Sequence, residues 1–283
     1  MKDAYSHPGF CDVAYDWDRR PECDFIERCI EKYSGAKVRS ILDIACGTGI
    51  HLMEFARRGY DAAGIDARRE MVDFVQKRSA AEGLDVKCAQ ADMKRFDIGR
   101  RFGCAICMLD SFRYLLTDKD ILSHLRSVSA SLEDGGIYVI DLWMPEDDRI
   151  GGWEDLRWTQ SRGNIRVDAR YLQHGETFNP GEKTFDDELI FKVTGPSVNS
   201  TVNSRAKTRA LLFSEFRELA ERGGSFELKE KFYNFDFNSK EGYNIKSMPN
   251  EAAHSSDSSA CRRITSQVTA SGIRTNLVLK KRR

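Results

Sequence analysis

The sequence predicts an α/β protein with a doubly wound, mostly parallel sheet of seven strands and an antiparallel β insertion after the fifth strand. Two observations carry this prediction. Strand patterns alternate with amphipathic helix patterns from residue 38 to residue 143, which is the order of parallel strands covered by helices on both faces. After residue 150 several strand patterns follow one another without a helix between them, as in antiparallel meanders.

The alternating part of the chain gives five strands and four helices. The strands are expected over 40–45, 61–66, 85–92, 101–109 and 135–143. The helices are expected over 22–33, 50–58, 68–82 and 117–132. Gly59 is a natural stop for the second helix, and Thr117 with Asp120 resembles a capping box for the fourth. Met71, Phe74 and Val75 give the third helix one apolar face.

The pattern of strands and helices changes in the second part of the chain. Strands are expected over 164–173, 185–193 and 204–213, then a helix over 214–222, then strands over 225–235 and 273–281. Ser214 is a plausible N-cap for that helix. Residues 239–271 are polar and rich in serine, so we expect a mobile loop there.

Composition excludes several classes of protein. The 44 basic and 44 acidic residues give no net charge, so we expect no general attraction to nucleic acid or to a membrane. The start has no apolar signal segment, and eight cysteines are scattered along the chain, which favours reduced thiols in the cytoplasm. Cys104 and Cys107 form a CxxC pair, but within a buried strand they point to opposite faces and read as structural rather than as a zinc or redox site.

The stretch "ILDIACGTGIHL", residues 41–52, places Gly47 and Gly49 between a buried strand and a helix. A phosphate-binding loop would require a lysine after the glycines, and this chain has none there. The dinucleotide fingerprint needs a third glycine where this chain has Leu52. An acidic residue about 20 positions further on would bind a ribose, and Asp66 ends the second strand at that distance. These residues predict a ligand with a ribose but without a pyrophosphate.

Five segments in this order resemble the class I S-adenosylmethionine (SAM)-dependent methyltransferases, and the resemblance extends over nearly the whole chain. The matching segments are "DIACGTG", "GIDARREMV", "QADMKRF", "LDSFRYLL" and "LEDGGIYVIDLW". The start "VAYDWDRR" and the insertion resemble the small-molecule branch, including the amino-sugar and glycine N-methyltransferases. The resemblance implies a Rossmann-like fold, SAM as cofactor and transfer of a methyl group.

The resemblance also implies which residues hold the cofactor. They are Tyr15, Arg20, Asp43, Ala45, Gly47, Gly49, Asp66, Ala67, Met71, Asp92, Met93 and Leu109. In the family, Asp66 would bind the ribose, Asp92 and Met71 would face the adenine, and Tyr15 and Arg20 would lie by the methionine moiety. Plainer roles stay open, because an acid after a strand also caps a turn and an apolar or aromatic residue also packs in a core.

The segments after the fourth and fifth strands should form the substrate pocket. We expect Asp110, Tyr114 and Asp141 to act in catalysis, with Asp110 or Asp141 holding a cationic amine, and Trp143 and His174 to contact substrate. Asp110 could instead cap its turn. His124 lies beside the apolar stripe of its helix and is expected at the surface. A sulfonium methyl is already activated, so alignment matters more than a dedicated base.

We therefore expect four segments: an N-terminal helical cover (1–37), a cofactor-binding core (38–150), a substrate-cover insertion (151–212), and a C-terminal helix with the closing strands (213–283). The expected function is methyl transfer to a small molecule, preferably to an amine nitrogen, by a cytoplasmic monomer or homodimer without metal, nucleic acid or membrane partners. The alternatives are a non-catalytic SAM-binding regulator and a nucleotide-cofactor oxidoreductase.

Overall fold

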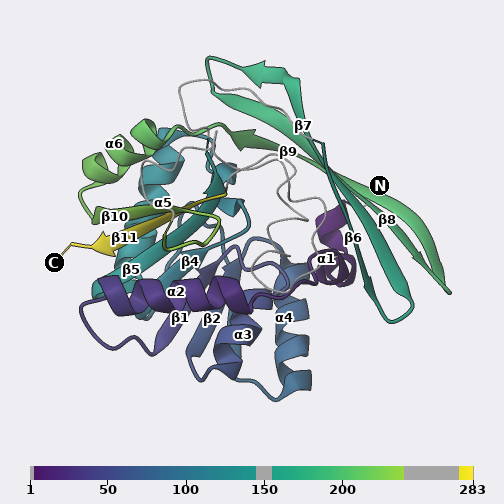
Figure 1. Ribbon diagram of the computed structural model, residues 1–283, viewed down its shortest axis with the longest axis horizontal. Coiled ribbons are helices and arrows are strands. Elements are labelled where there is room, and N and C mark those ends of the chain that lie inside the picture. The colour runs from purple at the N-terminus through teal and green to yellow at the C-terminus, as the bar shows by residue number, and fades with distance from the viewer. Residues whose placement is uncertain (1–2, 145–154, 239–273, 283) are drawn as a thin grey trace.

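The computed structural model describes residues 3–144, 155–238 and 274–282, and it contains two sheets (Figure 1). The strands of the larger sheet are β1 (Ser40–Ile44), β2 (Asp61–Asp66), β3 (Val86–Gln90), β4 (Phe102–Cys107), β5 (Leu132–Trp143), β10 (Phe226–Tyr233) and β11 (Arg274–Lys281). Their order is β10-β11-β5-β4-β1-β2-β3. Strands β1 to β5 pair in parallel, whereas β11 pairs antiparallel with both of its neighbours, β5 and β10. The predicted seven-stranded, mostly parallel sheet is confirmed.

Helices cover both faces of this sheet, as the alternating pattern predicted. The helices α2 (Arg20–Tyr33), α3 (Ile50–Arg57) and α4 (Arg69–Glu82) bury apolar residues in one core cluster. The helices α5 (Asp118–Ala130) and α6 (Phe213–Gly223) bury theirs in another cluster, on the opposite face. Cys104 and Cys107 fall into different clusters, and among the described residues no group of metal-binding side chains occurs. Both cysteines are therefore core residues.

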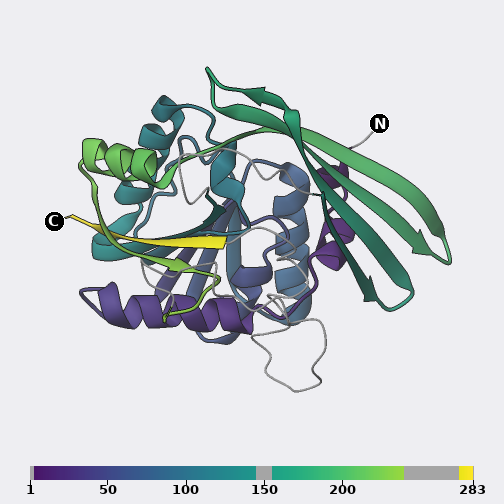
Figure 2. The same ribbon diagram turned by 45° about the horizontal axis from the view of Figure 1, so that its top comes forward.

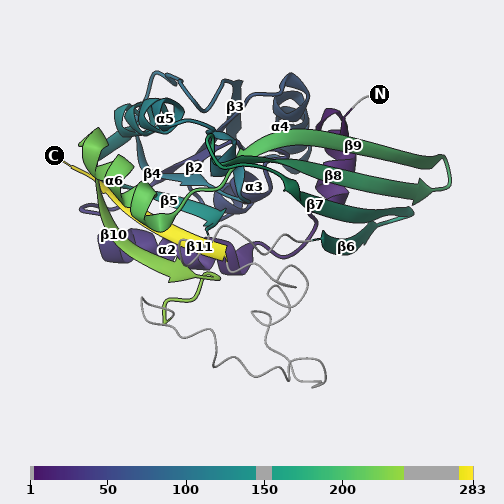
Figure 3. The same ribbon diagram turned by 90° about the horizontal axis from the view of Figure 1, so that it is seen from above.

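The smaller sheet is the predicted antiparallel insertion. It consists of β6 (Asp155–Arg162), β7 (Ile165–Asn179), β8 (Thr184–Gly195) and β9 (Val198–Arg209), paired in that order. Figures 2 and 3 show its long strands extending away from the larger sheet. Strand β6 was not predicted. The short helices η1 (Ala4–Ser6) and α1 (Pro8–Ala14) pack against this sheet in a third core cluster, which also contains Met71 of α4.

Three local predictions are wrong. Helix α6 is capped at Leu212 rather than Ser214, because the Glu215 carboxylate accepts the Leu212 N–H at 3.1 Å. Helix α5 ends at Ala130, and Leu132 already belongs to β5. His124 is fully buried rather than at the surface: its ring nitrogens contact the Met93 carbonyl and the Tyr138 hydroxyl, each at 2.7 Å.

Some predictions remain as they were. The loop expected over 239–271 lies outside the described residues, and the division into four segments stays a prediction. Within the described part of the chain, no helix combines the length and apolar character that a membrane span requires.

Candidate functional site

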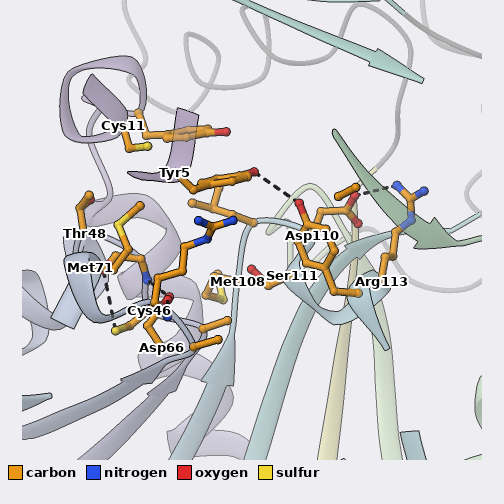
Figure 4. Close-up of a pocket in the computed structure, with 18 of the residues that line it drawn as sticks. Tyr5, Cys11, Cys46, Thr48, Asp66, Met71, Met108, Asp110, Ser111 and Arg113 are labelled. Carbon is orange, nitrogen blue, oxygen red and sulfur yellow. Dashed lines mark hydrogen bonds and ion pairs between the residues drawn. The ribbon is translucent and has the colours of Figure 1, made fainter. Parts of the chain in front are cut away.

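A cavity of about 580 Å³ lies at the carboxyl ends of the parallel strands. Its floor comes from the turns after β1, β2, β3 and β4, and β1 and β4 are the neighbours at which the strand order reverses. In open α/β sheets this edge is where ligands bind. The N-terminal segment and the inner face of the insertion supply the opposite wall. Figure 4 shows Tyr5 and Cys11 of the N-terminal segment across the cavity from Asp66.

The two glycines of the turn after β1 serve different purposes. Gly47 lines the cavity with φ +53°, and a side chain built there would meet nothing within 4 Å, so a ligand can approach the backbone. Gly49, with φ +74°, begins α3, and an added Cβ would come within 2.9 Å of Val75. Gly49 is therefore needed for packing and does not line the cavity. Ala45 also has a positive φ of 59°.

Asp66 ties the ends of β1 and β2 together. Its carboxylate accepts the N–H of Gly47 and the N–H of Arg68, both at 2.9 Å. The side chain is 8% exposed, and burial raises its pKa despite these two bonds. A carboxylate can accept about four hydrogen bonds, so it keeps capacity for hydroxyl groups of a ligand.

The surroundings of the Asp43 carboxylate favour binding of a cation. Asp43 lines the cavity at 2% exposure, and its buried Oδ2 has no hydrogen-bond partner among the described residues. Burial, with a further contribution from the Asp66 charge, raises the pKa of Asp43 well above its usual range. A positively charged ligand group beside Asp43 would reverse this effect.

These features fit SAM. It carries an ammonium group, which the unpaired Asp43 oxygen could receive, and a ribose, whose hydroxyls Asp66 could accept. The open space at Gly47 leaves room for the ligand beside the backbone. Asp92 and Met93 line the same cavity after β3, where the resemblance puts the adenine.

Aromatic side chains form much of the opposite wall. Tyr5 and Tyr114 meet at 3.3 Å through their hydroxyl groups, and burial raises the pKa of both. Tyr15 contacts the rings of Trp17 and Trp158, with centroids 5.6 and 5.8 Å apart. The wall thus joins the N-terminal segment, the turn after β4 and the insertion sheet around one space.

Asp110 and Trp143 lie side by side in the cavity wall. The Asp110 carboxylate accepts the Trp143 N–H at 2.8 Å through one oxygen and pairs with the Arg113 guanidinium at 2.7 Å through the other. Arg113 also lies 5.2 Å from the centre of the Trp143 ring. Figure 4 shows Asp110 and Arg113 joined in this way. Asp110 still lines the cavity, with its side chain 33% exposed.

Asp141 does not fit the role predicted for it. It is fully buried and does not line the cavity. Its carboxylate pairs with Arg274, accepts from the Asn276 side chain at 3.1 Å, and accepts the Leu109 N–H at 2.8 Å. The sequence places Asp141 two residues before the end of β5, and there its side chain faces β11 and the neighbouring turn instead of a ligand.

Most of the predicted site residues come together in the cavity. Those that line it are Tyr15, Asp43, Ala45, Gly47, Asp66, Ala67, Met71, Asp92, Met93, Leu109, Asp110, Tyr114 and Trp143. Gly49, Asp141, Arg20 and His174 do not line it. The Arg20 side chain is 71% exposed and pairs with Asp18. His174 faces Glu176 and Glu188 at 3.2 and 3.5 Å.

Several residues that line the cavity were not predicted from the sequence. They include Tyr5, Trp17, His51, Arg113, Trp158, Tyr171 and Arg274. Arg113 could have been noticed, because it lies within the segment "LDSFRYLL" next to two predicted residues. His51 belongs to the start of α3, next to the glycine turn. The others come from the N-terminal segment, the insertion and β11, whose positions over the cavity depend on tertiary packing.

The fold, the glycine turn and the two acids are similar to those of the class I methyltransferases. The family described as "Methyltransferase domain" matches residues 41–136. This segment contains the turns after β1 to β4, and therefore the floor of the cavity.

Relatives and solved structures are consistent with this similarity. A dTDP-3-amino-3,4,6-trideoxy-alpha-D-glucopyranose N,N-dimethyltransferase of Streptomyces venezuelae is 34% identical over 114 residues, 40% of this chain and 46% of that protein. A glycine/sarcosine N-methyltransferase of Parasynechococcus marenigrum (strain WH8102) is 29% identical, over 54% of each chain. The matches thus span about half of these relatives. An S-adenosylmethionine-dependent methyltransferase from Clostridium acetobutylicum ATCC 824 shares the fold with a TM-score of 0.69, at 19% identity over 96% of this chain and 95% of that one.

Proposed function

We propose that this chain binds SAM in the cavity and transfers its methyl group to an amine nitrogen of a small molecule. The observation that carries the proposal is the buried, unpaired Asp43 oxygen beside the open Gly47 backbone, at the edge of the sheet where ligands bind. The relatives named above, which methylate an amino sugar or glycine according to their names, support an amine acceptor.

The chain's residues would divide the work as follows. Asp43 and Asp66 hold the cofactor, which when bound supplies a methyl group on a positively charged sulfur. Asp110, Tyr114 and Trp143 form the acceptor wall, where the Asp110 carboxylate attracts a cationic amine. The aromatic residues of the N-terminal segment and the insertion exclude water and restrict the acceptor to a few orientations. Such alignment alone lowers the barrier by several kcal/mol, up to about 7–11.

Two measurements test the proposal. Calorimetry with SAM and with NAD(H) separates a methyltransferase from an oxidoreductase, and binding of NAD(H) alone would overturn the proposal. Methyl transfer from labelled SAM to matched panels of amines, alcohols and acids then tests the acceptor. A protein that binds SAM but methylates no member of any panel would instead be the non-catalytic regulator.

The broader expectations stay predictions. They are a cytoplasmic protein, a monomer or homodimer, and no nucleic-acid or membrane partner. Sedimentation of the purified chain with and without SAM tests the oligomeric state. Ionic strength should have little effect on SAM binding, because Asp43 and Asp66 are buried and salt screens buried charges only weakly.

A further inference from the structure

Tyr171 and Asp187 form a buried pair behind the acceptor side of the cavity. Tyr171, on β7, lines the cavity, and its hydroxyl donates to Oδ2 of Asp187 on β8. The Thr208 hydroxyl, on β9, donates to the same oxygen at 2.7 Å. Asp187 is 3% exposed, and its Oδ1 has no hydrogen-bond partner among the described residues. One cavity-lining phenol therefore connects the cavity to a half-satisfied carboxylate.

Within the described ranges, no cationic side chain forms with Asp187 the direct ion pair that usually accompanies a buried charge. The nearby Arg113 is engaged elsewhere: it bonds to Asp110 at 2.7 Å, to the Thr208 hydroxyl at 2.9 Å and to the Arg209 carbonyl at 3.1 Å. Burial raises the pKa of Asp187, although the Arg113 charge and the bonds from Tyr171 and Thr208 oppose this. The free energy cost of protonating Asp187 is thus smaller than for an exposed aspartate.

We propose that Tyr171 is a catalytic residue and that Asp187 acts through it as the proton acceptor for the amine substrate. This inference rests on the proposed function. A proton moves from the acceptor's ammonium nitrogen to the Tyr171 oxygen, while the phenolic proton moves to Oδ2 of Asp187. The ammonium becomes a neutral amine with a free lone pair, Tyr171 remains a phenol, and Asp187 becomes a carboxylic acid. The reverse path returns the proton to solvent after the product has left.

Other groups around the cavity are less suited to this role. Asp110 accepts from both Trp143 and Arg113, so it is stabilised as an anion and suited to holding a cation. Tyr114 and Tyr5 bond to each other, and this pair offers no carboxylate to take the proton onward. His51 lies at the start of α3, beside the glycine turn, and its Nε2 contacts Glu22 at 2.5 Å. The titratable and charged groups near Asp187 are Tyr171, Tyr114, Arg113 and Asp110. Of these, Tyr171 bonds to Asp187 directly.

The experiment compares the wild type with Tyr171→Phe and Asp187→Asn, each of which keeps the size of the side chain. The matched control is Tyr33→Phe, which removes the Tyr33 contact to Glu230 (3.3 Å), another phenol–carboxylate pair, outside the cavity. Two acceptors are used with labelled SAM: a primary aminodeoxysugar, which is protonated at pH 7, and methoxyamine, which is not.

With the aminodeoxysugar, both variants should lose about a hundredfold or more in kcat/KM at pH 7, within the usual range for general base catalysis. The loss should shrink by about tenfold per pH unit up to the pKa of the amine, because the neutral acceptor then binds directly from solution. With methoxyamine, the variants should stay within about threefold of the wild type. Tyr33→Phe should match the wild type with both acceptors.

A structural role would give a different result. If the pair only supports the wall, both acceptors should lose activity alike and the loss should not depend on pH, and this outcome would overturn the inference. SAM affinity and melting temperature are measured for each variant. If Asp187→Asn fails to fold, the pH profile of Tyr171→Phe decides. A wild type that binds SAM but methylates neither acceptor nor any amine of the panel would refute the proposed function itself.

Discussion

Asp43 connects stability to ligand binding at the level of a single residue. A carboxylate with a raised pKa keeps its proton in the folded protein at pH values where the unfolded chain has released it. In that window the folded state binds more protons, so the free energy of unfolding falls as pH rises from the unfolded pKa, about 3.9, through the folded pKa. Asp43 therefore lowers the free energy of unfolding of the ligand-free protein at neutral pH.

We expect Asp43→Asn to remove this loss. Between pH 4 and pH 8 the melting temperature of the wild type should fall more than that of Asp43→Asn, and the variant should be the more stable protein at pH 8, because asparagine carries no charge that burial and Asp66 disfavour. Affinity for SAM should fall at the same time. Thermal unfolding across this pH range, with calorimetry at pH 8, provides the measurement. If the melting temperatures of the two proteins changed equally with pH, Asp43 would be ionised and paired in the free protein.

Asp66 gives a second prediction at this scale. Asp66→Asn should lower SAM affinity at least tenfold, because a hydrogen bond to a charged group contributes about 1.5–3 kcal/mol. The melting temperature should fall slightly as well, since the same carboxylate accepts the Gly47 and Arg68 N–H groups. Asp61→Asn is the control: Asp61 begins the same strand, is exposed and pairs with Arg100. Unchanged SAM affinity in Asp66→Asn would exclude Asp66 from the site.

At the scale of elements, the turn after β4 depends on its neighbours. Leu109 and Asp110 both have positive φ values, 55° and 64°, which non-glycine residues adopt at a cost. The Leu109 N–H donates to the Asp141 side chain and the Asp110 N–H to the Asp141 carbonyl at 3.1 Å. Strand β5 thus holds the turn in the shape that brings Asp110 to the cavity, while Arg274 of β11 neutralises Asp141.

Asp141→Asn should therefore act mainly on stability. Breaking a buried ion pair typically costs about 3–5 kcal/mol. Arg274 keeps Glu22, at 3.6 Å, as a second carboxylate partner, so we expect the loss to lie at the lower end of that range. Because the turn would loosen as a whole, KM should rise for SAM and for the acceptor together. Asp73→Asn removes an exposed pair with Arg69 and should change stability by about 1 kcal/mol or less. A rise in the acceptor KM alone, without a loss of stability, would show instead that Asp141 belongs to the acceptor site.

Elements buried on both faces were predictable from the sequence, and exposed ones were less so. Strand β4 is a continuous apolar run with every residue buried, so its pattern leaves little choice. Strand β6 is an edge strand without a buried residue, and in "DLRWTQSR" only Leu156 and Trp158 alternate with polar residues, which is too short a pattern to predict a strand. It was missed because cross-strand pairing, rather than burial, makes it a strand. His124 was misread because α5 packs against both the sheet and α6, which widens its buried face.

For the whole molecule, the cavity is shared by three parts of the chain. Tyr15 comes from the N-terminal segment, Met71 from the core and Tyr171 from the insertion. The site residues carried by the motifs of the core could be predicted from sequence, because the turns after parallel strands meet at one edge. The aromatic wall could not, since no local pattern tells which face of the insertion covers that edge.

This sharing predicts long-range coupling. Phe191 is fully buried in the third cluster, and its ring lies 6.3 Å from that of Tyr15. Phe191→Ala should destabilise by about 3–5 kcal/mol and should make residues 3–15 sensitive to protease. SAM at 100 times its dissociation constant should restore about 2.7 kcal/mol and part of the protection. Phe216→Ala, in the cluster of α6, should destabilise without exposing residues 3–15. Equal protease sensitivity in the two variants would argue against the coupling.

The position of β11 in the sheet affects how this protein folds while the ribosome synthesises it. β11 is the last described element in the sequence, yet it lies between β5 and β10 in the sheet. While synthesis has not passed residue 281, β5 has an open edge whose residues Ile137, Val139 and Ile140 are apolar, and β10 has no strand to pair with. Open apolar edges invite pairing with other chains. Nascent chains in this state should need shielding by a chaperone, and translation that stalls before β11 emerges should yield aggregates rather than a smaller folded domain.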